Sequence, residues 1–260
     1  MTAVLYVIAA LIGISLGLIG AGGAIVAVPA FVYLGEIPPT LASGYALFVV
    51  AIATAVGAIQ YLRAGLVDWR SVGAFGVTTL VSIALIRRFL LPTLPAEFTV
   101  LQTSISTNMA LMLAFGGILI GAGIAMLRGK PKPHTDEPAH LGRLTVFGLI
   151  IGIVSGFLGV GGGFLMTPAL VLWANIDMKK AVGTSLVLIS ANGLVGVGAD
   201  LMGDVQYDWP FLLTFTALTT IGILVGTMLS KKIDGQKLKA GFGYFVLTLG
   251  AVVLIRELVH

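Results

Sequence analysis

The chain of 260 residues is 58% hydrophobic and only 10% charged, with a mean hydropathy of +1.07. A soluble domain averages roughly 25% charged residues, so this composition excludes a globular protein covered by water. The net charge of +4 comes from basic residues in short loops between apolar runs, which indicates membrane topology rather than nucleic-acid binding. The lack of cysteine excludes disulfides, thiol nucleophiles and cysteine-ligated metals.

The first predicted element is an apolar stretch over residues 3–34 that contains the cluster Gly20-Ala21-Gly22-Gly23. As one straight helix it would measure about 48 Å, whereas the hydrocarbon core of a bilayer is about 30 Å thick. The stretch therefore either crosses once as a broken helix, or enters, turns at the glycines and returns to the same face. Because its start carries no basic segment, we expect no cleaved signal peptide.

Further apolar runs without Asp, Glu, Lys or Arg follow, and most reach or approach the ~20 residues that a membrane helix needs. They cover residues 37–62, 71–86, 98–127, 144–176, 181–199, 209–230 and 240–255. Residues 128–143, rich in proline and charge, predict a solvated linker. We therefore expect a first transmembrane repeat over 1–127, a linker over 128–143 and a second transmembrane repeat over 144–260.

The two halves resemble each other. The segment that starts at Gly13 aligns without a gap for about fifty residues with the segment that starts at Gly152, an offset of 139. After one inserted residue, Asp68-Trp69 matches Asp208-Trp209. Glycines and a proline in fixed register are not expected of two unrelated apolar stretches, so we infer an internal repeat. Identical pairs include Gly17/Gly156, Gly20/Gly159, Gly22/Gly161, Gly23/Gly162, Pro29/Pro168, Gly44/Gly183 and Gly57/Gly196.

The basic residues distinguish the two arrangements of the glycine-rich stretches. If both stretches cross, the chain has eight crossings and its 15 Lys and Arg divide seven against eight. If both are re-entrant, six segments cross and the division becomes twelve against three, as the positive-inside rule expects. We therefore predict an all-α polytopic membrane protein with two inverted repeats, each a re-entrant or broken glycine-rich helix plus three spanning helices. The linker would be cytoplasmic and both termini external.

Backbone breaks inside a membrane expose amide groups, which are tolerated only where protein or water meets them. Glycine lets such N–H groups converge on a ligand, and a helix that starts after the turn adds its positive dipole end. We interpret Pro29 and Pro168 as helix-break prolines that mark those starts, with Thr167 as an N-cap. The expected anion site comprises Gly20, Gly22, Gly23, Ala24, Gly161, Gly162, Gly163, Phe164 and Thr167.

The alternative is that the paired glycine clusters only permit close helix packing. We give that interpretation to three other small-residue spacings, Gly13/Gly17, Gly152/Gly156 and Gly222/Gly226.

Further candidate ligands are Thr184, Ser185 and Asn192. The first half lacks the Gly-Thr-Ser pattern, and Tyr45, at the position equivalent to Thr184, is the candidate there. Hydroxyls in membrane helices often bond their own backbone instead. The polar run 102–108 lines a gate or lies at the membrane interface.

No ionisable residue lies in the middle of a predicted span, so the sequence shows no proton relay and no catalytic base or metal ligand. We expect neither an enzyme nor a cofactor. The expected partners are a small anion and the lipid bilayer, and self-association into a homo-oligomer is left open.

The paired motifs resemble the TauE/SafE sulfite-exporter family over nearly the whole chain. They read Gly20-Ala21-Gly22-Gly23 with Pro29, residues 159–164 with Pro168, and then residues 181–186. The resemblance implies a secondary transporter, in the exporting direction, of small sulfur-containing anions such as sulfite, sulfoacetate or other organosulfonates. It would work by alternating access in a bacterial plasma membrane, and an anion channel of the same architecture is the alternative.

Overall fold

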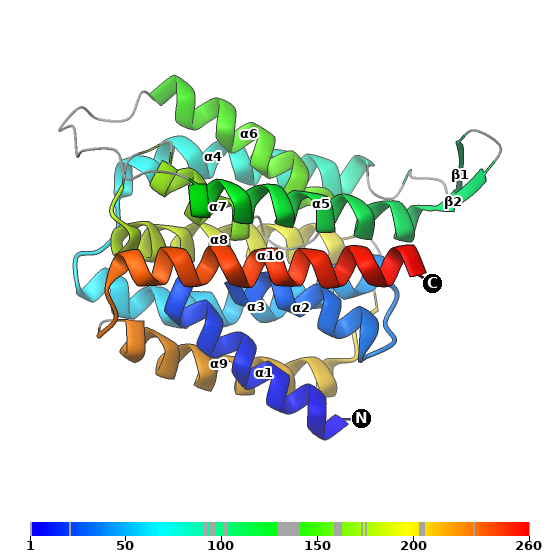
Figure 1. Ribbon diagram of the computed structural model, residues 1–260, viewed down its shortest axis with the longest axis horizontal. Helices are drawn as coiled ribbons and strands as arrows, with labels where there is room; N and C mark the ends of the chain where they lie inside the picture. Colours follow the sequence, from blue (N-terminus) through cyan, green and yellow to red (C-terminus); the bar gives the residue numbers. More distant parts are fainter. Residues whose placement is uncertain are drawn as a thin grey trace.

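The computed structural model describes residues 2–20, 22–90, 93, 97–100, 103–128, 141–158, 163–172, 174, 176–202, 206–230 and 232–259, and helices dominate this part of the chain (Figure 1). A π-helical turn, Ile86–Leu90, extends α4, and two short strands, β1 (Glu97–Val100) and β2 (Thr103–Ser106), precede α5. The α-helices are α1 (Thr2–Ile19), α2 (Gly22–Tyr33), α3 (Pro39–Arg63), α4 (Trp69–Leu85), α5 (Thr107–Arg128), α6 (Leu141–Leu158), α7 (Gly163–Leu172), α8 (Met178–Leu201), α9 (Trp209–Ser230) and α10 (Gly235–Val259).

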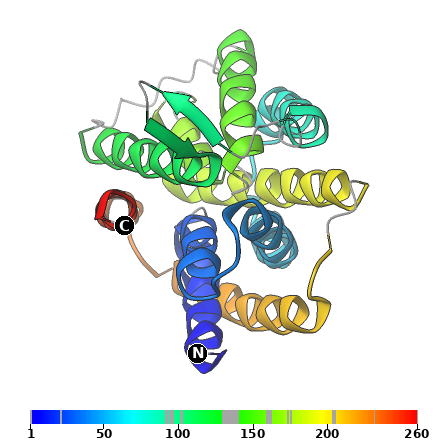
Figure 2. The same cartoon turned by 90° about the vertical axis from the view of Figure 1, so that its right-hand side faces the viewer.

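Six of the described helices are long and apolar enough to cross a membrane: α3, α4 with its π-helical turn, α5, α8, α9 and α10. The helical membrane class is therefore confirmed. α3 and α8 form the centre, because 72% of the apolar window of each is buried, against 33–44% in the other four. α4 packs with α6 on one side of this central pair, and α1 packs with α9 on the other (Figure 2).

The N-terminal apolar stretch is re-entrant. α1 runs beside α9 in the same direction, since Gly13 contacts Thr219 and Gly17 contacts Gly226. α2 then returns to the end from which α1 came, where the Tyr33 hydroxyl donates to Glu257 (2.8 Å) near the end of α10. Figure 1 shows this return, so the structure follows the second of the two alternatives for residues 3–34.

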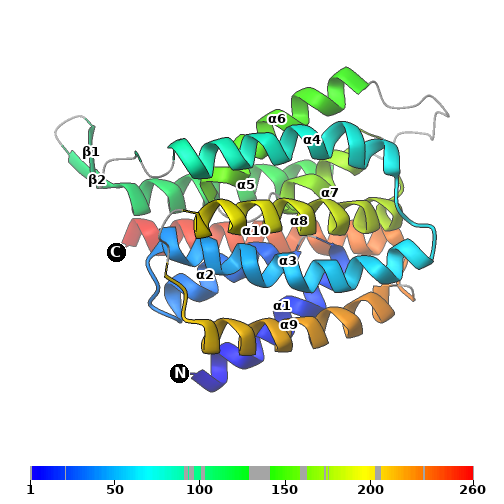
Figure 3. The ribbon, with the colours of Figure 1, turned by 180° about the vertical axis from the view of Figure 1, so that it is seen from behind.

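The second glycine-rich stretch enters from the opposite end. α6 starts there, and α7 runs back to it and leads into α8 (Figures 1 and 3). We call this the basic end, because Arg63, Lys180 and Lys232 lie there, and we call the other the terminal end, because both chain ends lie there (Figure 1). The opposite entry of the hairpins agrees with six crossings, while the inverted relation of the whole repeats stays a prediction.

Equivalent glycines make equivalent contacts in the two halves. A Cβ atom at Gly13, Gly17, Gly152 or Gly156 would meet the backbone or Cβ atoms of the neighbouring helix, so the expected close packing there is confirmed. Gly13 contacts Thr219, and the equivalent Gly152 contacts Thr79; Gly17 contacts Gly226, and the equivalent Gly156 contacts Ile86. The glycines of each pair are 139 residues apart, and the residues that they contact are 140 apart.

The strand pair is an element that the sequence did not indicate. β1 and β2 pair antiparallel, with Glu97 opposite Ser106, at the terminal end of α5 (Figure 1). The segment is rich in threonine, valine and isoleucine, which favour extended backbone. Part of the polar run 102–108 is therefore strand, and α5 begins only at Thr107.

Candidate functional site

The first glycine break is a tight turn against α8. Gly20 has a φ of +80°, a left-handed conformation that glycine adopts without strain. Its amide donates to the Leu16 carbonyl oxygen (2.7 Å) at the end of α1. A Cβ atom on Gly20 would lie only 2.7 Å from the Ser185 hydroxyl oxygen. Both its conformation and its surroundings therefore require glycine.

Two buried hydroxyls meet beside this turn. Thr167 on α7 donates to Ser185 Oγ (3.0 Å), and Ser185 donates to the Val182 carbonyl oxygen (2.9 Å). Both side chains are fully buried. The structure thus brings together three predicted site residues, one from the turn after α1 and one each from α7 and α8, and we call Gly20, Thr167 and Ser185 the Gly20 cluster.

The other predicted glycines lie at helix starts. Residues 22–24 form the first turn of α2, and residues 163–164 begin α7. The first N–H groups of a helix have no acceptor within it, so they are available to a ligand or to neighbouring protein. Residues 161–162 fall outside the described residues. Because α2 packs against α7, the two glycine-led helices occupy one region of the interior.

The two prolines do not begin helices, and the prediction that they do is wrong. Pro29 lies inside α2, which starts at Gly22, and Pro168 lies inside α7, which starts at Gly163. Thr167 is accordingly not an N-cap. Helices packed within a membrane protein tolerate an internal proline because neighbouring groups meet the carbonyl that loses its N–H donor.

Asn192 lies in α8 and is completely buried. Its Oδ1 accepts from the Thr79 hydroxyl on α4 (3.3 Å), and its Nδ2 lies 4.0 Å from Met166 Sδ on α7. The amide therefore links the second hairpin to two spanning helices, and it lies apart from Gly20 in the part of α8 beyond Ser185.

Thr184 and Tyr45 lie at opposite ends of the molecule rather than in the Gly20 cluster. The Asp68 amide donates to Thr184 Oγ1 (2.9 Å), and the Asp208 amide donates to the Tyr45 hydroxyl (2.7 Å). These acceptors occupy equivalent positions of the repeat, as do the two aspartates. Each hydroxyl therefore fastens the loop that precedes α4 or α9 to a central helix.

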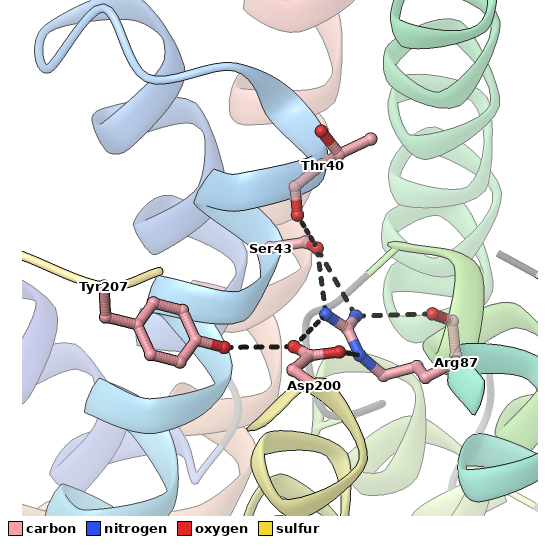
Figure 4. Close-up of polar contacts among 6 residues, drawn as sticks. Thr40, Ser43, Arg87, Asp200 and Tyr207 are labelled. Atoms are coloured by element: carbon pink, nitrogen blue, oxygen red, sulfur yellow. Dashed lines mark hydrogen bonds and ion pairs between the residues drawn. The ribbon is translucent and has the colours of Figure 1, made fainter. Parts of the chain in front are cut away.

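A buried ion pair at the terminal end was not found from the sequence. Arg87 Nε donates to Asp200 Oδ1 (2.8 Å), and its Nη2 pairs with Oδ2 (Figure 4). Arg87 Nη1 lies 3.3 Å from Ser43 Oγ and 3.5 Å from the Gly156 carbonyl oxygen, and Tyr207 donates to Asp200 Oδ2 (3.1 Å). Burial, and then the Asp200 carboxylate, raises the pKa of Tyr207, so this phenol remains a donor. We call these five residues the Arg87 cluster.

The basic end has a neutral counterpart. The Tyr61 hydroxyl lies 2.7 Å from Ser230 Oγ and donates to the Gly17 carbonyl oxygen (3.3 Å). Tyr61 and Gly17 stand at the positions equivalent to Asp200 and Gly156. The pairing of Tyr61 with Asp200 in the repeat was the one signal in the sequence that could have marked this difference.

A small cavity adjoins the Arg87 cluster. It has a volume of about 10 Å³, close to what one water molecule needs, and it is lined by residues of α2, α3, α5 and α6 that include Ser43 and Phe157. Within the residues that the structure describes, no group of three or more His, Asp or Glu side chains could hold a metal ion. The groups available to a ligand in this part of the chain are therefore amide and hydroxyl hydrogen-bond donors and the buried guanidinium of Arg87.

Comparison with known proteins extends this picture. The model of the family described as Sulfite exporter TauE/SafE matches residues 5–253. A probable membrane transporter protein of Xylella fastidiosa is 29% identical and covers 95% of this chain and 92% of its own length. The probable membrane transporter protein YdhB of Bacillus subtilis is 27% identical, covering 88% and 91%. The probable membrane transporter protein MJ0441 of Methanocaldococcus jannaschii is 24% identical, covering 78% and 73%. No solved structure matches the chain.

Proposed function

The chain belongs to the Sulfite exporter TauE/SafE family of membrane proteins, and from this premise we propose that it exports small sulfur-containing anions such as sulfite, sulfoacetate or other organosulfonates. Transport would proceed by alternating access between the two halves. Family and relatives alike are membrane transporters, so the coarse function does not depend on this choice of substrate.

The observation that carries the proposal is the Gly20 cluster. It lies where the first hairpin turns, against α8 of the other half, and two hydroxyls converge there without a charged side chain. Each hydroxyl has a single proton, and the Ser185 proton is now held by the Val182 carbonyl. An anion at the turn would accept hydrogen bonds from that hydroxyl and from the amides of the first turn of α2, which are the donors that oxyanions require. By the repeat, residues 161–162 would supply the second set of amides.

The hairpins support alternating access. They enter from opposite ends, as in transporters whose substrate lies between repeats (Figure 1). The basic end would face the cytoplasm, because the loops and helix ends there carry most of the Lys and Arg, and the termini would be external. A cysteine at Met202, which is 76% exposed at the terminal end, should react with an impermeant maleimide added outside cells; reaction only after permeabilisation contradicts this orientation.

Flux into proteoliposomes tests the substrate. Purified protein should take up labelled sulfite or sulfoacetate saturably and show counterflow, whereas an anion channel of this architecture would show uptake without counterflow. Sulfate and chloride serve as competitors. Failure to take up any of these anions would contradict the proposal.

A matched pair of glycine variants tests the site. Gly20→Ala should abolish uptake, because its Cβ would press on Ser185 and its left-handed backbone costs about 1–2 kcal/mol for alanine. Gly65→Ala carries the same backbone cost, since Gly65 has a φ of +67°, but nothing lies within 4 Å of its Cβ position. It should transport normally. Equal uptake by both variants would move the site away from the Gly20 turn.

A further inference from the structure

Arg87 places a positive charge inside the protein, close to the second hairpin. Its side chain is 2% exposed, and its guanidinium points at a carboxylate rather than at water. It belongs to a π-helical turn, a local irregularity that is frequent at functional sites. The Gly156 carbonyl oxygen that it approaches is three residues before Gly159, where the second glycine break begins. The charge is therefore near the route that an anion would take from the terminal end.

The Asp200 carboxylate shows which ligand this guanidinium accepts. Two nitrogens of Arg87 meet its two oxygens side by side, which is the geometry that arginine uses for carboxylates and phosphates. A sulfite or sulfonate group offers a comparable pair of negatively charged oxygens. The small cavity is lined by Ser43, whose hydroxyl lies 3.3 Å from Nη1 of the same guanidinium.

The position of Asp200 in the fold would let its carboxylate separate from Arg87. It lies in the last turn of α8, where the next residues, Leu201 and Met202, are 49% and 76% exposed. Its other partner, Tyr207, comes from the connection between α8 and α9 rather than from a spanning helix. A short movement of this helix end would bring the carboxylate into water, where its charge is solvated.

We propose that Arg87 is an anion-binding residue at the terminal end, where a small oxyanion takes the place of the Asp200 carboxylate. This inference rests on the proposed function, because the same anion would pass between Arg87 and the glycine turns. Asp200 then acts as a tethered competitor that occupies the guanidinium whenever no anion is bound. The exchange makes and breaks only hydrogen bonds and an ion pair.

Sulfite binding to the purified protein tests the proposal independently of transport. The dissociation constant is measured from the sulfite-dependent rise in the thermal unfolding temperature, with chloride at equal ionic strength as reference. Asp200→Asn removes the charged competitor and should lower the dissociation constant about tenfold, because the anion no longer has to displace a charge-assisted hydrogen bond. The double variant R87Q/D200N restores a neutral pair and should bind at least tenfold more weakly than D200N. Arg88→Gln removes the same charge from the neighbouring exposed arginine and should bind as the unaltered protein does.

A purely structural ion pair gives a different pattern. D200N would then unfold more readily but bind sulfite as before, and R87Q/D200N would bind and transport normally, which would overturn the proposal. If D200N does not fold, Arg87→Lys keeps the charge without the paired geometry, and unchanged binding by that variant is equally contradictory. If the unaltered protein binds sulfite but does not transport it, the proposed function fails while the role of Arg87 is still measured.

Discussion

At both ends of the molecule a re-entrant hairpin is joined to the spanning helices, but the side chains that join them differ in charge. At each end, a side chain in the last turn of a central helix bonds the end of a neighbouring spanning helix, and one side chain of that pair contacts a carbonyl oxygen of a re-entrant hairpin. At the basic end the contact consists of Tyr61, Ser230 and the Gly17 carbonyl, all uncharged. At the terminal end the contact is an ion pair, in which Asp200 stands at the position equivalent to Tyr61 and its partner Arg87 stands at the position equivalent to Thr227.

The difference teaches that the fold requires the contact but not the charge. A neutral phenol joins the hairpin to the bundle at the basic end, so an ion pair is not needed for that purpose. Burying two charges costs several kcal/mol of desolvation per ion, and well-packed neutral residues often replace such pairs without loss of stability. A charge kept at one end only is better understood as serving the anion than the fold.

The largest expected effect comes from removing one charge at the terminal end. Arg87→Ala leaves Asp200 buried without its partner and should lower the free energy of unfolding by about 3–5 kcal/mol. Ser230→Ala at the basic end removes one neutral hydrogen bond and should cost about 1 kcal/mol. Denaturant titration in mild detergent measures both, and equal losses would mean that the two ends do not differ as described.

A smaller effect separates the two helix crossings that hold the hairpins. Gly222 on α9 lies against Ala10 and Gly13 of α1, whereas its repeat counterpart on α4 is Ser82, facing Gly152. Gly222→Ser should therefore destabilise the protein by about 1–3 kcal/mol through overpacking. Ser82→Ala, at the equivalent site, removes only a hydroxyl that donates to the Thr78 carbonyl oxygen of its own helix (2.8 Å) and should cost about 0.5 kcal/mol. The thermal unfolding temperatures of the two variants measure this difference, and a Gly222→Ser variant as stable as the unaltered protein would contradict it.

The smallest effect should be the same at both ends. Tyr45→Phe and Thr184→Val each remove the hydroxyl that accepts from the amide of Asp208 or Asp68. Each should cost about 1 kcal/mol, because one amide loses its protein acceptor at a site near water. The same unfolding measurement applies, and a loss of sulfite binding in either variant would show instead that the hydroxyl contacts the anion.

The sequence predicted those features that depend on glycine and on the distribution of charge. The close contact of Gly13 with Thr219 and the turn at Gly20 follow from what a missing side chain permits, and that can be read from residue type and spacing. The six spanning helices follow from apolar length. Together these give most of the fold.

The remaining features depend on position in space. Arg87 and Arg88 are neighbours in sequence at the end of an apolar run, yet one is buried against Asp200 and the other donates to the Met202 carbonyl oxygen with its side chain exposed. Which of them faces inward depends on the π-helical turn, a shift that residue type does not predict. For Thr184 the sequence left two roles open, a ligand or a hydroxyl bonded to its own backbone; the structure has it donating to the Lys180 carbonyl oxygen (2.8 Å) and accepting from the Asp68 amide (2.9 Å).

The depth of the Gly20 turn has an electrical consequence. Ser185, which it contacts, comes seven residues after the start of α8, or about 10 Å along a helix that spans roughly 30 Å of hydrocarbon. The turn is therefore about one third of the way in from the basic end. A monovalent anion that reached it from the terminal end would have crossed some two thirds of the membrane voltage, about 1.5 kcal/mol for every 100 mV.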